Sequence, residues 1–81
     1  SLELFPNPAS DLLQVQVPST KRGEANIRIT DAAGKQVYVK SFLLYEGVNA
    51  LSIPVAGLPG GIYYLSKESK DGKQVISFVK K

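Results

Sequence analysis

Apolar and polar residues alternate along much of this 81-residue chain, and the alternation restricts the fold more than any other feature. Ala25, Ile27 and Ile29, each separated from the next by a polar residue, form the clearest example. Successive side chains of a β-strand point to opposite faces, so a period of two predicts strands with one buried face. Seven short strands are predicted on this basis, over residues 2–5, 13–17, 25–30, 37–44, 51–55, 62–69 and 74–79.

Turn-forming residues separate these segments at intervals of roughly 8–12 residues, a spacing typical of small all-β domains. Asp31 and Gly34 favour a type I turn followed by a left-handed glycine. Pro59 fixes its own φ, and we expect positive φ at Gly60, at Gly61 or at both, so the chain reverses sharply here. We therefore predict one domain with an all-β fold, an antiparallel seven-stranded β-sandwich of Ig-like dimensions. A small barrel is the alternative architecture.

Three places depart from the regular pattern. Residues 42–44 are all apolar, which predicts a bulge or a strand covered on both faces. Pro54 lacks a backbone donor, so its strand is expected to lie at a sheet edge or to end there. Tyr38 alternates with valines along its strand. Aromatic residues of a sheet usually face the core, and the alternative for Tyr38 and Tyr64 is that both face outward. Two such rings would form a stacking platform for a sugar.

The composition argues against several classes of function. Ten Lys and Arg against seven Asp and Glu give a net charge of only +3, and these residues are scattered, unlike the clustered cations of nucleic-acid-binding domains. The chain has no His and no Cys, so it lacks the commonest general base and metal ligand. Acidic residues lie in or beside turns, where capping is a simpler role than calcium binding; these are Glu24, Asp31, Glu46 and Asp71. We expect no enzyme activity, no metal site and no cofactor.

Targeting segments are not expected in this stretch of sequence. No run approaches the ~18 apolar residues of a membrane-spanning helix. The first residues have neither the basic nor the apolar region of a signal peptide.

Several short motifs occur in a fixed order along the chain. They are Pro6-Asn7-Pro8 within residues 5–11, Leu13 and Val15, Asp31 with Gly34-Lys35, Gly47-Val48-Asn49, Leu58 to Tyr63 with Gly60-Gly61, Asp71-Gly72-Lys73, and the closing Phe78-Val79-Lys80-Lys81. Over residues 2–81 this series resembles the C-terminal sorting domain of type IX secretion system cargo proteins, in its type A form.

The resemblance implies a function that the residues alone do not. Such domains end larger secreted proteins of Gram-negative bacteria and are the signal that the outer-membrane translocon and its carrier proteins recognise. A sortase-like peptidase typically removes them, and the cargo is released or kept on the cell surface. We therefore expect residues 1–81 to be one sorting domain excised from a larger protein that crosses the periplasm and outer membrane. The recognition residues carried over are Pro6, Asn7, Pro8, Gly34, Gly61, Tyr63, Lys80 and Lys81.

Two other functions suit the same sandwich fold, a carbohydrate-binding or adhesion module and a spacer without a ligand. The Lys80-Lys81 pair looks like the natural end of a protein, which favours the sorting domain. We expect both lysine charges to be exposed and to contribute little to stability. Residues 74–79 are the expected docking element. If that strand lies at a sheet edge, its free backbone groups can pair with a partner strand.

Overall fold

The computed structural model describes residues 2–81, which form seven β-strands and no helix. The strands are β1 (Glu3–Phe5), β2 (Leu12–Ser19), β3 (Gly23–Asp31), β4 (Gln36–Leu44), β5 (Gly47–Pro54), β6 (Gly61–Ser69) and β7 (Gly72–Lys80). Every predicted strand is present, with bounds that differ from the prediction by a few residues. Among the described residues there is no helix of the length and apolarity that crossing a membrane requires.

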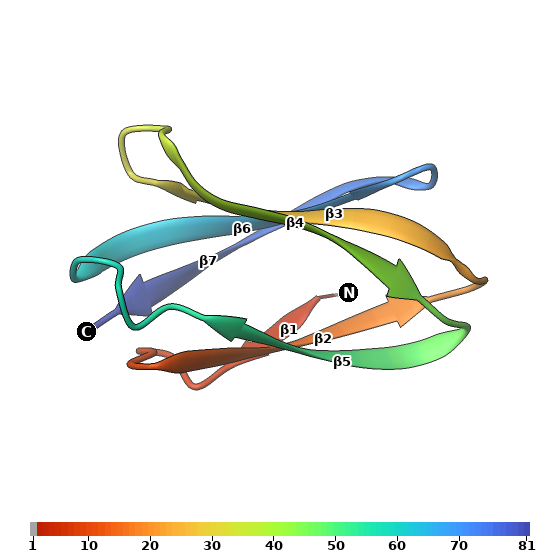
Figure 1. The fold of residues 1–81 in the computed structure, drawn as a ribbon, viewed down its shortest axis with the longest axis horizontal. Helices are drawn as coiled ribbons and strands as arrows, with labels where there is room; N and C mark the ends of the chain where they lie inside the picture. The colour runs from red at the N-terminus through yellow and green to blue at the C-terminus, as the bar shows by residue number, and fades with distance from the viewer. Residues whose placement is uncertain (1) are drawn as a thin grey trace.

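Two antiparallel sheets face one another, and the predicted β-sandwich is confirmed (Figure 1). One sheet has the order β1-β2-β5, and the other has the order β4-β3-β6-β7. This is the plan of an Ig domain, except that the fourth strand pairs with β3 and not with β5. The ends of the strands gather at the two ends of the sandwich, where the connecting turns lie.

The core lies between the sheets and is supplied by the alternating positions of the central strands. On β2 the buried residues are Leu13, Val15 and Val17, as the alternation predicts. The polar residues between them point to the other face, so each central strand buries one side only. Opposite them the second sheet contributes Ala25, Ile27, Ile29, Tyr63, Leu65 and Phe78. This two-layer core is the main apolar burial available to so short a chain.

Strand β4 differs from the prediction in the position of its irregularity. The pairing between β3 and β4 shifts between Ile29 and Thr30, opposite Val37, so the bulge lies near the start of β4. Residues 42–44 continue the regular register, and the bulge predicted there is wrong. The run is apolar on both faces of the strand. Phe42 and Leu44 pack inward, and Leu43 lies half-exposed on the outer face.

The bulge also changes where Tyr38 points. Tyr38 pairs with Ile29 and packs against the core, where burial raises the pKa of its hydroxyl above the usual value. Tyr64 pairs with Thr30 on the outer face of the same sheet and is 44% exposed. The two rings lie on opposite faces of the sheet, so they do not form the alternative arrangement, a sugar-stacking platform.

Strand β5 confirms both predictions made from Pro54, that its strand lies at a sheet edge and that it ends there. The strand is an edge of the three-stranded sheet, and it ends at Pro54. Asn49 ties this strand to its surroundings: its side-chain oxygen accepts from the Tyr45 N–H, and its amide donates to the Tyr45 and Val17 carbonyls. The Asn49 side chain thus fixes the turn between β4 and β5 against β2.

Candidate functional site

The residues expected to carry recognition gather at one end of the sandwich. In the four-stranded sheet, Asp31, Tyr63 and Phe78 lie side by side in adjacent strands, and Gly61 pairs with Lys80. The turn that contains Gly34 follows Asp31, so it lies beyond the same end, as do the turns before β2 and β6 (Figure 1, left). We call this region the motif end; it comprises Pro6, Asn7, Pro8, Gly34, Gly61, Tyr63, Lys80 and Lys81.

The Pro-Asn-Pro turn is joined to the last strand although about seventy positions separate them in sequence. Asn7 Oδ1 accepts a hydrogen bond from the Val79 N–H at 2.9 Å. Ala9 then donates its N–H to the Val79 carbonyl at 2.8 Å and accepts from the Lys81 N–H at 2.9 Å. Ala9 and Lys80 form an isolated parallel bridge. Both peptide bonds that precede Pro6 and Pro8 are cis.

Two successive glycines serve different purposes in the turn before β6. Gly61 has φ +156°, where a side chain is strained, and it pairs with Lys80. Gly60 has no positive φ, but a Cβ on it would lie 3.2 Å from the Lys81 carbonyl carbon. The expected positive φ is therefore found at Gly61 alone. A side chain on Gly60 would crowd the backbone of Lys81, which passes close by.

Tyr63 belongs to the core and also holds the turn that precedes it. It is only 4% exposed, and its ring stacks on Phe78 with centroids 5.6 Å apart. Its hydroxyl donates to the Pro59 carbonyl at 2.5 Å. A tyrosine suits this position because an apolar ring and a polar tip are both used. The geometry gives Tyr63 a positioning role at the motif end.

The two closing lysines differ in their surroundings. Lys81 is exposed, as expected of a charged residue at the end of a strand. Lys80, expected to be equally exposed, is only 8% exposed, and its Nζ donates to the Lys81 carbonyl at 3.1 Å. That expectation was wrong because Lys80 lies on the inward face of β7, across from Gly61, where its aliphatic stem is covered.

Gly34 occupies a separate hairpin at this end. It has φ +87°, and its N–H donates to the Asp31 carbonyl, which confirms the predicted turn. The Asp31 carboxylate accepts from the Ala33 and Lys35 N–H groups and so caps the hairpin. None of the hydrogen bonds described for residues 2–81 joins Gly34 to the Pro-Asn-Pro turn or to the closing lysines. The structure therefore brings together seven of the eight expected residues and places Gly34 nearby.

Strand β7 lies at an edge of the four-stranded sheet, as the docking hypothesis required. Val79 bonds to Asn7 and Ala9, so its N–H and C=O point away from β6. Alternate residues of an antiparallel pair point the same way, so Lys73, Val75 and Ser77 also direct both backbone groups outward. The Pro-Asn-Pro segment covers the edge at Val79, and the stretch before it has no neighbouring strand.

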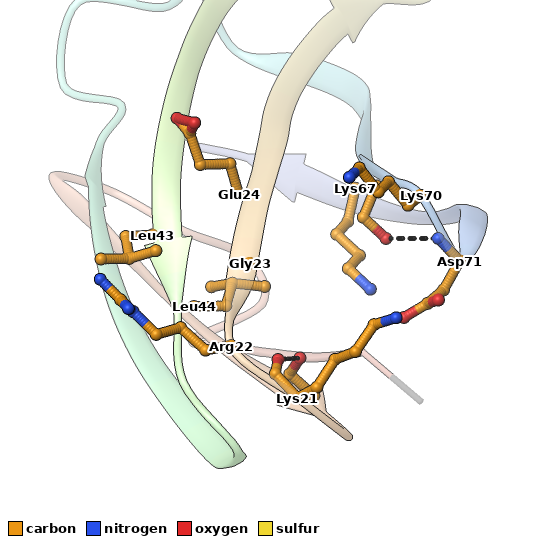
Figure 2. A pocket seen from close by; sticks show the side chains of 11 residues that line it. Lys21, Arg22, Gly23, Glu24, Leu43, Leu44, Lys67, Lys70 and Asp71 are labelled. Carbon is orange, nitrogen blue, oxygen red and sulfur yellow. Dashed lines mark hydrogen bonds between the residues drawn. The ribbon is translucent and has the colours of Figure 1, made fainter.

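The other end of the sandwich contains a hollow of about 580 Å³ (Figure 2). Lys67, only 8% exposed, extends into it, and Lys21 and Asp71 extend toward the same place. Arg22 turns away toward Leu43. Four cationic and two acidic side chains line the hollow, a net +2; they are Lys21, Arg22, Lys67 and Lys70 with Glu24 and Asp71. Within residues 2–81 no three His, Cys, Asp or Glu residues lie close enough together to hold a metal.

Sequence reasoning missed three residues that build these regions. Ala9 is completely buried and bridges to the last strand, yet an alanine in a turn gives no local signal of such a contact. Gly60 was grouped with Gly61 as a source of positive φ. Asn49 was noticed only as part of a motif, although Asn side chains near turns commonly hydrogen-bond to neighbouring backbone groups.

The sequence of residues 3–81 matches the family described as secretion system C-terminal sorting domain. The chain belongs to this family, the type IX secretion C-terminal sorting domains. No curated protein matches the chain. Since the match spans nearly every described residue, both the motif end and the hollow lie within the sorting domain. A domain of this kind is a signal and not a catalytic unit.

Proposed function

We propose that residues 1–81 are one sorting domain of a larger secreted protein, and that the motif end is the part read by the type IX machinery. The single observation that carries the proposal is the joining of Asn7 and Ala9 to Val79 and Lys81. Through these bonds, motif residues from both ends of the sequence form one surface. Such a surface exists only in the folded domain, so the machinery recognises a shape and not a linear tag.

The partners follow from this role. The motif end contacts the translocon and its outer-membrane carrier proteins, with Lys81 as the exposed charge and the Pro-Asn-Pro turn beside it. A sortase-like peptidase removes the domain after export. The cargo then reaches the medium or remains on the cell surface.

A reporter fusion tests the proposal. The domain is placed after a periplasmic reporter that carries its own signal peptide, in a bacterium with a type IX system and in the same strain without its translocon. Reporter in the medium or on the surface of the first strain, with periplasmic reporter in the second, is the expected result. Periplasmic reporter in both strains would refute the sorting role. Substitutions suit this assay better than deletion of residues 77–81, because that deletion also removes the buried, stacked ring of Phe78.

A further inference from the structure

The two edges of the four-stranded sheet differ in how well they are protected. Natural sheets guard free edges with bulges and with charged side chains that point inward. Edge strand β4 has both protections. It has a bulge at Val37, and Lys40 lies on its inward face across from Ile27. Residues 73–77 of β7 have neither, because their pairing with β6 is regular and the one charged residue, Lys73, lies on the outer face beside Glu68.

The unprotected stretch of β7 offers a set of groups suited to strand pairing. Lys73, Val75 and Ser77 each present an N–H and a C=O toward the empty side of the strand. The chain itself shows that this edge accepts a neighbour, because Ala9 forms a parallel bridge at its far end. A strand added at residues 73–77 would lie along the same edge of β7 to which Ala9 is bridged.

The outer face beside this edge indicates the chemistry of the added strand. Large apolar side chains lie exposed on the outer face of β6 and β7, where Ile62 pairs directly with Val79 and the others occupy alternate positions of the same two strands. They are Ile62, Tyr64, Val75 and Val79, each between 41% and 56% exposed. Two exposed basic residues of this region, Lys73 and Lys81, lie at the start and just beyond the end of β7. The charge of Lys70 in the preceding turn is offset by its neighbour Asp71, and the nearby Glu68 is already paired with Arg28 at 2.5 Å. A complementary segment has apolar side chains on one face and acidic residues at its ends.

We propose that residues 73–77 of β7 receive an extended segment of the export machinery, apolar on one face and acidic at its ends, which pairs as an additional strand. This inference rests on the proposed sorting function and names the site and chemistry of one contact in it. Pairing through main-chain hydrogen bonds supplies affinity, and the apolar face and the lysines supply specificity.

Two serines provide a matched test of strand pairing. Ser77 and Ser41 are both exposed, and they lie on the two opposite edges of the same sheet. The register directs the N–H of each away from its own sheet, so a proline at either position removes an outward donor without breaking a ladder bond. In the reporter fusion, Ser77→Pro should leave most reporter in the periplasm, and Ser41→Pro should be exported like the unchanged domain. Circular dichroism and thermal melting of both variants establish that they fold.

A second pair of variants keeps the test decisive if Ser77→Pro does not fold. Lys73→Glu reverses a charge beside the edge, and Lys21→Glu makes the same change at the hollow. We expect reduced export for Lys73→Glu alone. Equal export of Ser77→Pro and Ser41→Pro, or of the two glutamate variants where the proline variant is unfolded, would overturn strand pairing while leaving the sorting role in place. Failure of the unchanged fusion to be exported would refute the sorting role, and this contact with it.

Discussion

The two ends of this sandwich are built from similar turns but are held together in different ways. At the motif end, residues about seventy positions apart are joined by backbone and side-chain hydrogen bonds to Val79 and Lys81. At the other end Asn49 links one turn to β2, but other turns are satisfied locally, as in the bonds from Ser19 to Lys21 and from Asp71 to Ser69, and a hollow with a buried lysine remains. The difference indicates that the motif end is formed by segments far apart in the sequence, so its shape depends on the whole fold.

The largest expected effect is on the glycine that starts β6. Gly61→Val places a β-branched residue at φ +156°, and we expect a loss of ~1–3 kcal/mol in unfolding free energy. The control is Gly23→Val in the turn region of the other end, where φ is not positive and no atom lies within 4 Å of an added Cβ. Thermal melting should show a clear drop for Gly61→Val only. A comparable drop in both would mean that strain at Gly61 is not the cause.

Two asparagines allow stability and recognition to be separated. Asn49→Ala removes three hydrogen bonds near the hollow and should cost ~2 kcal/mol, whereas Asn7→Ala removes one exposed bond and should cost ~1 kcal/mol. Export should follow the opposite order, with Asn7→Ala the more impaired, because Asn7 lies at the motif end. The measurements are chemical denaturation of the domain and reporter export at a temperature where both variants are folded. If export simply followed stability, the motif end would have no special role.

A smaller effect is expected from the Tyr63 hydroxyl. Tyr63→Phe keeps the ring stacked on Phe78 and removes only the bond to the Pro59 carbonyl, which should cost about 1 kcal/mol. At roughly 4–8 °C per kcal/mol for a domain of this size, the melting temperature should fall measurably. Tyr64→Phe, on the exposed outer face, is the control and should melt like the unchanged domain. Equal melting of all three proteins would show that the Tyr63 hydroxyl does not hold the turn.

Most of the fold could be predicted because its signals are local. The alternation in β2 and β3 and the turn chemistry at Asp31 and Gly34 identified strands and hairpins that the structure confirms. The face of Tyr38 could not be predicted, because one bulged residue near Val37 reverses the inward and outward positions that follow it.

The site was only partly predictable for a related reason. Family motifs drew attention to Asn7 and Lys80, but their surroundings depend on contacts between distant segments. The burial of Lys80 follows from its inward position on β7 across from Gly61, and the bond from Asn7 to Val79 depends on how the first turn lies against the last strand. Neither contact leaves a pattern in the neighbouring sequence.

Removing a matched pair of lysine charges from each end of the sandwich, in two separate variants, tests the central claim most directly. Lys80 and Lys67 are each 8% exposed, and each is accompanied by an exposed lysine, Lys81 or Lys70. The variant Lys80→Met with Lys81→Ala, and the variant Lys67→Met with Lys70→Ala, remove two charges each, and methionine retains an apolar stem of similar length at the buried position.

The measurement is the fraction of reporter exported by each fusion, after melting curves have shown that both domains fold. The sorting account predicts that the variant at the motif end leaves most of its reporter in the periplasm, while the variant at the hollow is exported like the unchanged domain. Equal export of the two variants, or a stronger defect for the variant at the hollow, would contradict the claim that the motif end is the surface read during secretion.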